Sequence, residues 1–178
     1  MKHTLSVLTE NHAGVLSKVS GLFTRRGFNI DSLAVGVTED PAISRMTIVV
    51  HGDDAVVEQV EKQLNKIIPV IKVKTFSEGE YLSRQLSLIK VAAPPSRRAE
   101  LMKIAELMNA RILDVSPTSM TFEFTDTLER TEVMEDLLRP FGIREIVRTG
   151  TIAIEKGASI TRSKKASQDQ AGPGATSP

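Results

Sequence analysis

The feature that most constrains the fold is an order of strand and helix patterns that occurs twice. The first copy occupies residues 1–78 and the second occupies residues 79–157. In each copy, alternation of apolar and polar residues predicts strands, and apolar residues that recur every three or four positions predict helices. The predicted order is strand, helix, strand, strand, helix, strand. This order is typical of a ferredoxin-like βαββαβ domain, so the sequence predicts an α+β chain of two such domains.

Several residues mark the ends of these elements. Gly27 follows a helical stripe that ends in two arginines, and a glycine there can adopt the left-handed conformation that ends a helix. Asp53 or Asp54 can cap the second helix, and Pro69 stops it. In the second copy we expect a strand at residues 86–89, a helix around 101–108, strands at 112–115 and 120–124, a helix at 128–138 and a closing strand at 143–154.

Residues 158–178 differ in composition from the rest of the chain. They are rich in Ser, Gln, Gly, Pro and Ala and have almost no apolar bulk, so we predict a disordered tail. The formal net charge of the whole chain is only +1. Because nucleic-acid binding needs a concentrated basic face, we do not expect it here. No run approaches about 20 consecutive apolar residues, so we expect no membrane span and predict a soluble cytoplasmic protein.

The sequence contains no recognisable catalytic or metal-binding pattern. There is no cysteine, and the three histidines, His3, His12 and His51, are not at metal-ligand spacing. Neither a P-loop nor a nucleophile elbow is present. We therefore predict no catalytic residue, no metal site and no cofactor on this chain. The alternative is a small stand-alone enzyme whose residues have no recognisable spacing.

The most informative segment is the loop between the first predicted strand and the first helix. Gly14 lets the backbone approach a ligand closely. The helix start that follows leaves the N–H groups of Val15, Leu16 and Ser17 unpaired, and such donors suit a carboxylate. The competing explanation is purely structural, with Asn11 as the helix cap and Gly14 in a tight turn.

A second segment contains another polar side chain that could contact the same ligand. Asn29, like Asn11, both donates and accepts, so it can contact the carboxylate and ammonium of a zwitterion without adding net charge. Alternatively, Asn29 is an ordinary turn residue before a strand. Together with apolar neighbours that can receive a small aliphatic side chain, the predicted effector site comprises Asn11, Gly14, Val15, Leu16, Asn29 and Ile30.

These segments resemble a known family. Glu10-Asn11-His12-Ala13-Gly14-Val15-Leu16-Ser17 and Arg26-Gly27-Phe28-Asn29-Ile30-Asp31-Ser32-Leu33 are similar to the regulatory small subunits of acetolactate (acetohydroxyacid) synthase. Residues 44–48, 60–66, 112–115 and 148–150 look like the same family. The resemblance covers about residues 1–157 and is looser in the second half. It implies an N-terminal ACT domain at 1–78 and a C-terminal ferredoxin-like domain at 79–157.

The family resemblance also implies a function. Two ACT domains would pair side by side in a homodimer and bind valine at their interface. Asn11, Gly14, Val15 and Leu16 would come from one protomer, and Asn29 and Ile30 from its neighbour. Many ACT domains have Asp and Pro in this loop, where this chain has Asn11 and Ala13, as expected for the small-subunit variant.

In this interpretation the chain is a non-catalytic subunit in branched-chain amino acid biosynthesis. It would activate a separate catalytic large subunit and confer feedback inhibition by valine. Thiamine diphosphate, Mg²⁺ and FAD would be bound by that partner. The residues alone do not rank valine against leucine or isoleucine, because one methylene discriminates by only ~1–3 kcal/mol. The alternative function is a tandem ACT amino-acid sensor that acts on a transcription partner.

Overall fold

The computed structural model describes residues 1–161, which form two compact units. The first unit comprises residues 1–82 together with residues 153–161, and the second comprises Ser83–Ile152. Each unit has an antiparallel sheet and its own hydrophobic core. The predicted fold class, two ferredoxin-like α+β domains, is confirmed.

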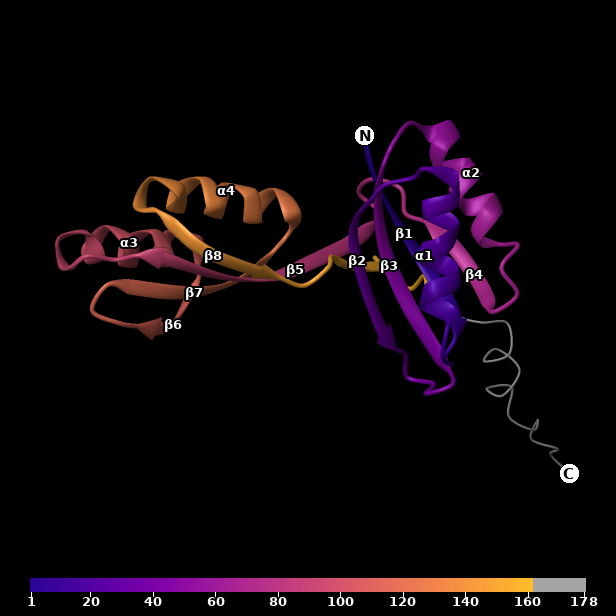
Figure 1. Ribbon diagram of the computed structural model, residues 1–178, viewed down its shortest axis with the longest axis horizontal. Helices are drawn as coiled ribbons and strands as arrows, with labels where there is room; N and C mark the ends of the chain where they lie inside the picture. The colour runs from indigo at the N-terminus through magenta and orange to yellow at the C-terminus, as the bar shows by residue number, and fades with distance from the viewer. Residues whose placement is uncertain (162–178) are drawn as a thin grey trace, which may run out of the picture. The chain divides into compact units, whose positions relative to one another are not determined.

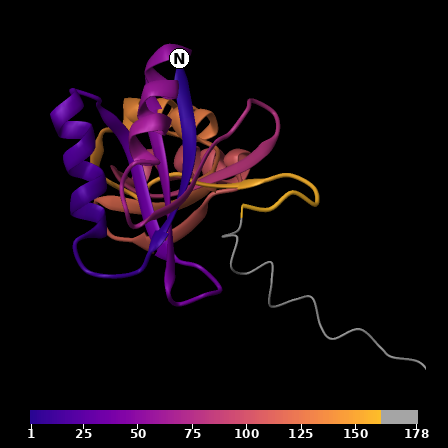
Figure 2. The ribbon, with the colours of Figure 1, turned by 90° about the vertical axis from the view of Figure 1, so that its right-hand side faces the viewer.

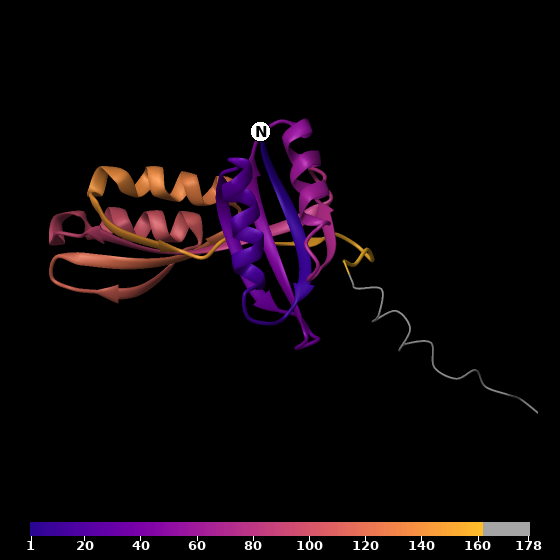
Figure 3. The same ribbon diagram turned by 45° about the vertical axis from the view of Figure 1, so that its right-hand side comes forward.

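The first unit follows the predicted βαββαβ order. The four strands form one antiparallel sheet in the order β2-β3-β1-β4, and both helices cover the same face of it (Figure 1). Figures 2 and 3 show α1, in indigo, and α2, in magenta, beside this sheet from two further directions. The elements are β1 (Lys2–Glu10), α1 (Val15–Arg26), β2 (Ile30–Val37), β3 (Ile43–His51), α2 (Asp54–Leu64) and β4 (Val70–Thr75).

Local signals in the sequence explain where these helices begin and end. Gly27 ends α1 at φ 68°, and its N–H donates to the carbonyl oxygens of Phe23 and Thr24. Only glycine adopts this conformation without steric cost, as the sequence predicts. Asp53 caps α2, because its side chain accepts a hydrogen bond from the backbone N–H of Val56.

The second unit repeats the arrangement. Its strands are ordered β6-β7-β5-β8, and residues of α3 and α4 pack with β5 and β7 around Phe122, Met134 and Leu138, none of which is exposed. Single 3₁₀ turns precede α3 and follow α4. The elements are β5 (Tyr81–Ala92), α3 (Arg98–Met108), β6 (Arg111–Val115), β7 (Ser119–Asp126), α4 (Leu128–Leu138) and β8 (Ile143–Arg148).

The C-terminal part of the described chain differs from the sequence prediction. The predicted closing strand at 143–154 is two strands, β8 and β9 (Ile152–Glu155), and β9 pairs with β5. Residues 153–161 belong to the first unit, where Glu155 pairs with Lys74 of β4 and accepts a hydrogen bond from Thr161. Of the predicted tail at 158–178, residues 162–178 lie outside the described residues.

Candidate effector site

The start of α1 has the geometry of an anion-binding site. Gly14 precedes the helix at φ 84° and ψ −7°, a conformation that favours glycine. The first helical hydrogen bond runs from the N–H of Lys18 to the carbonyl of Gly14, at 3.0 Å. No side chain caps this end, and the first turn has no acidic residue. The N–H groups of the first turn are therefore available to a carboxylate.

Asn11 has a structural role that differs from the capping explanation. Its Nδ2 donates to the carbonyl oxygen of Pro41 at 2.8 Å, and its Oδ1 accepts from the hydroxyl of Ser44 at 3.0 Å. Its backbone N–H donates to the carbonyl of Ala42 at 2.8 Å. Asn11 therefore ties the glycine loop to the connection between β2 and β3, and the interpretation of Asn11 as the cap of α1 is wrong.

The two apolar residues of the loop face different surroundings. The Val15 side chain is buried in the core of the first unit, so Val15 can offer a ligand only its backbone N–H. Leu16 is 44% exposed and is free to contact an aliphatic group. The sequence shows an apolar stripe on one helical face. It does not show that Val15 is buried while Leu16 is exposed, because this difference depends on which face packs on the sheet.

The remaining predicted residues lie at the other end of α1. Asn29 is exposed, and its Nδ2 donates to the carboxylate of Asp31 at 2.9 Å. Ile30 begins β2 and packs partly against the core. Since α1 has 12 residues, it separates the two groups by about 18 Å. A single chain does not bring Gly14 and Asn29 together on one small ligand.

A carboxylate and an imidazole lie close together beside the loop. Glu10 lies 3.1 Å from the imidazole Nε2 of His12, and both side chains are about half exposed. At the far end of α1, Arg25 and Arg26 occupy the last turn, where they complement the negative end of the helix dipole.

The described residues contain neither a metal-binding cluster nor a membrane-spanning helix. Among residues 1–161, no three His, Cys, Asp or Glu side chains are grouped so that they could hold a metal ion. Within the same residues, every helix is too short or too polar to cross a membrane. The predictions about cofactors and cytoplasmic location stay predictions.

Both halves of the chain are similar to known proteins. Residues 5–72 match the model of the acetohydroxyacid synthase small subunit-like ACT domain, and residues 84–157 match the model of the small subunit of acetolactate synthase. A protein of Archaeoglobus fulgidus, named as a probable acetolactate synthase small subunit, is 52% identical over 157 residues, which are 88% of this chain and 98% of that protein. The chain belongs to the acetolactate synthase small-subunit family.

Two further relatives agree with this membership. The acetolactate synthase small subunit of Mycolicibacterium smegmatis is 50% identical over 155 residues, covering 87% of this chain and 91% of the relative. The crystal structure of the acetolactate synthase small subunit from Thermotoga maritima superposes with a TM-score of 0.82 at 37% identity, covering 89% of this chain and 99% of that one. The predicted family is therefore confirmed, also for the second half of the chain, where the resemblance is looser.

Proposed function

We propose that this chain is a non-catalytic regulatory subunit that binds the catalytic large subunit of an acetolactate synthase, activates it and makes it sensitive to valine. Membership in the small-subunit family supports the choice of partner. The observation that carries the effector assignment is the uncapped start of α1 at Gly14, free of acidic residues. Thiamine diphosphate, Mg²⁺ and FAD belong to the catalytic partner in this proposal.

Valine binds between two copies of the ACT domain. Its carboxylate accepts hydrogen bonds from the first N–H groups of α1 in one copy. The amide oxygen of Asn29 in the second copy accepts from the ammonium group, and the isopropyl group lies against Leu16 of the first copy and Ile30 of the second. The 18 Å between the two ends of α1 supports this arrangement, because only a second copy can supply both sets of groups to one ligand.

Regulation then follows from differential binding. Burial of the isopropyl group contributes about 1.5–3 kcal/mol, and the hydrogen bonds to the zwitterion add to it. Valine shifts the equilibrium only if it prefers one regulatory state over the other. A coupling free energy of about 1–3 kcal/mol gives several-fold inhibition of the catalytic subunit.

Reconstitution with a cognate catalytic subunit tests the proposal. We expect the chain to increase acetolactate formation and added valine to reduce that increase. Gly14→Asp places a carboxylate where the ligand carboxylate binds, and Asn29→His replaces the facing amide. Both variants should activate the partner and lose the response to valine.

Gly79→Asp is the matched control for Gly14→Asp. Gly79 has a similar φ of 81°, and an added Cβ at either position meets no atom within 4 Å. Both substitutions therefore introduce the same backbone strain and the same charge, but only one lies at the start of α1. Valine inhibition that persists in both Gly14→Asp and Asn29→His would refute the effector site, and no effect on the cognate catalytic subunit would refute the regulatory role.

A further inference from the structure

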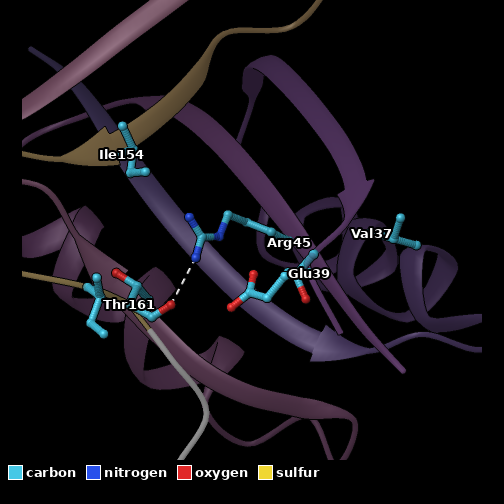
Figure 4. Close-up of a pocket in the computed structure, with 7 residues that line it drawn as sticks. Val37, Glu39, Arg45, Ile154 and Thr161 are labelled. Carbon is cyan, nitrogen blue, oxygen red and sulfur yellow. Dashed lines mark hydrogen bonds between the residues drawn. The ribbon is translucent and has the colours of Figure 1, made fainter. Parts of the chain in front are cut away.

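A cavity of about 400 Å³ lies in the first unit, apart from the effector residues (Figure 4). It opens where the end of β2, the start of β3 and the C-terminal segment meet. Its volume lies within the range of small-molecule sites. The lining residues are Val37, Thr38, Glu39, Arg45, Ile154, Ile160 and Thr161.

Arg45 is the central charged group of this cavity. On the sheet it lies directly opposite Leu8 of β1 and Gly36 of β2. Leu8 is only 2% exposed, so one side of Arg45 adjoins a buried apolar side chain. A Cβ added to Gly36 would meet no atom within 4 Å. Open space therefore lies on the other side of Arg45, over a strand position that has no side chain.

The charge of Arg45 is not neutralised by the described part of the protein. Its Nη2 donates to the carbonyl oxygen of Thr161 at 2.8 Å, as the dashed line in Figure 4 shows. Its Nε is buried and has no hydrogen-bond partner. No ion pair joins Arg45 to a carboxylate among residues 1–161. Because an unpaired, partly buried cation is costly, the site favours an anion.

The rest of the wall restricts the kind of anion. The side chains of Val37, Ile154 and Ile160 are each more than half exposed, an apolar surface suited to a small hydrocarbon group. Glu39 also lines the cavity and is exposed. Its carboxylate repels a second negative charge, which disfavours phosphates and dicarboxylates.

We propose that this cavity binds a small aliphatic carboxylate that carries one carboxylate group. The carboxylate pairs with the guanidinium of Arg45, and the hydrocarbon part lies against Val37, Ile154 and Ile160. A simple fatty acid and an aliphatic amino acid share this chemistry. The site is separate from the proposed effector site, since none of its residues lies in the glycine loop or next to Asn29.

The test is a titration of the full chain with 3-methylbutanoate, followed by calorimetry and ligand-observed NMR. We expect saturable binding that Arg45→Gln weakens by about tenfold or more, because a hydrogen bond to a charged group is lost. Arg45→Lys should recover part of the affinity. Arg130→Gln is the control, since Arg130 is a half-exposed arginine of α4 paired with Asp126. Gly36→Leu should block binding by filling the space beside Arg45.

Glu39→Gln provides a test that loss of structure cannot imitate. Isopropylmalonate, which carries two carboxylates, should bind Glu39→Gln at least about tenfold more tightly than the unmodified chain, because the repelling charge is gone. Valine is compared with 3-methylbutanoate in the Asn29→His background. Tighter binding of valine identifies amino acids as the ligands, and tighter binding of 3-methylbutanoate identifies simple carboxylates.

Two results would overturn the proposal. The first is the absence of 3-methylbutanoate binding to the unmodified chain, and the second is equal affinity in Arg45→Gln and the unmodified chain. Neither result bears on the proposed effector site. Conversely, Asn29→His should abolish valine inhibition of the holoenzyme and leave 3-methylbutanoate binding unchanged.

Discussion

The substitution Glu155→Gln tests whether the segment after β9 is part of the first unit. The Glu155 side chain is 9% exposed, pairs with Lys74 and accepts a hydrogen bond from Thr161 at 2.8 Å. A hydrogen bond between charged groups contributes about 1.5–3 kcal/mol. Lys74 is 39% exposed, so solvent screening lowers the expected loss to about 1–2 kcal/mol. Glutamine keeps the shape and the bond from Thr161 but removes the charge.

Urea unfolding and hydrogen exchange provide the readouts. We expect a decrease of about 1–2 kcal/mol in the free energy of unfolding of the first unit. The amide of Lys156, which donates to the carbonyl of Glu80, should exchange faster. The control is Glu58→Gln, because Glu58 forms a solvent-exposed pair with Lys62, so its loss should change the free energy of unfolding much less than the loss of Glu155. Equal losses in the two variants would refute the reasoning.

The same carboxylate gives the first unit a pH dependence of known sign. Hydrogen bonds from Lys74 and Thr161 lower the pKa of Glu155 below its ordinary value. A carboxyl whose pKa is lower in the folded state stabilises the fold at pH values above its unfolded pKa, and this contribution is lost as the pH falls through the folded pKa. Acid should therefore destabilise the unmodified first unit more than it destabilises Glu155→Gln.

Three further changes have expected outcomes. Gly27→Ala should destabilise the first unit by about 1–2 kcal/mol in urea unfolding, because alanine is strained at φ 68°. Asp53→Ala should cost about 1 kcal/mol in the same assay, since the cap on the N–H of Val56 is lost. Ser44→Ala removes the hydrogen bond that orients Asn11, and we expect a several-fold higher valine concentration for half inhibition of the reconstituted enzyme.

Local features of the fold are predictable from the sequence because their causes are local. The helix predicted at 128–138 has the same ends in the structure, where Thr127 caps its start and a 3₁₀ turn that contains Pro140 follows its end. The break between β8 and β9 is not predicted. Apolar residues occur on both sides of residues 149–151, and the contacts that hold Glu155 in the first unit involve Lys74, which is 81 residues away.

In the candidate site too, features with local causes can be predicted from the sequence and features with long-range causes cannot. A glycine before a helical stripe predicts the open start of α1, because only the local backbone is involved. The side-chain partners of Asn11 are Pro41, before β3, and Ser44, at the start of β3. They lie 30 and 33 residues further along the chain, and their positions depend on the pairing of β1 with β3. The unpaired charge of Arg45 cannot be predicted from the sequence either, because the surroundings of this side chain form only when the C-terminal segment packs on the first unit.

In the proposed arrangement, the length of α1 links effector binding to dimer formation. The groups proposed to hold valine lie about 18 Å apart in one chain, farther than one small amino acid can reach. If valine binds as proposed, it binds the pair of chains and not the separate chain, so valine binding and dimer formation strengthen each other by the same factor. Feedback through this site must weaken when the protein is diluted below its dimerisation constant. The Arg45 cavity, formed within one chain, is free of this linkage, so dilution separates the two sites thermodynamically.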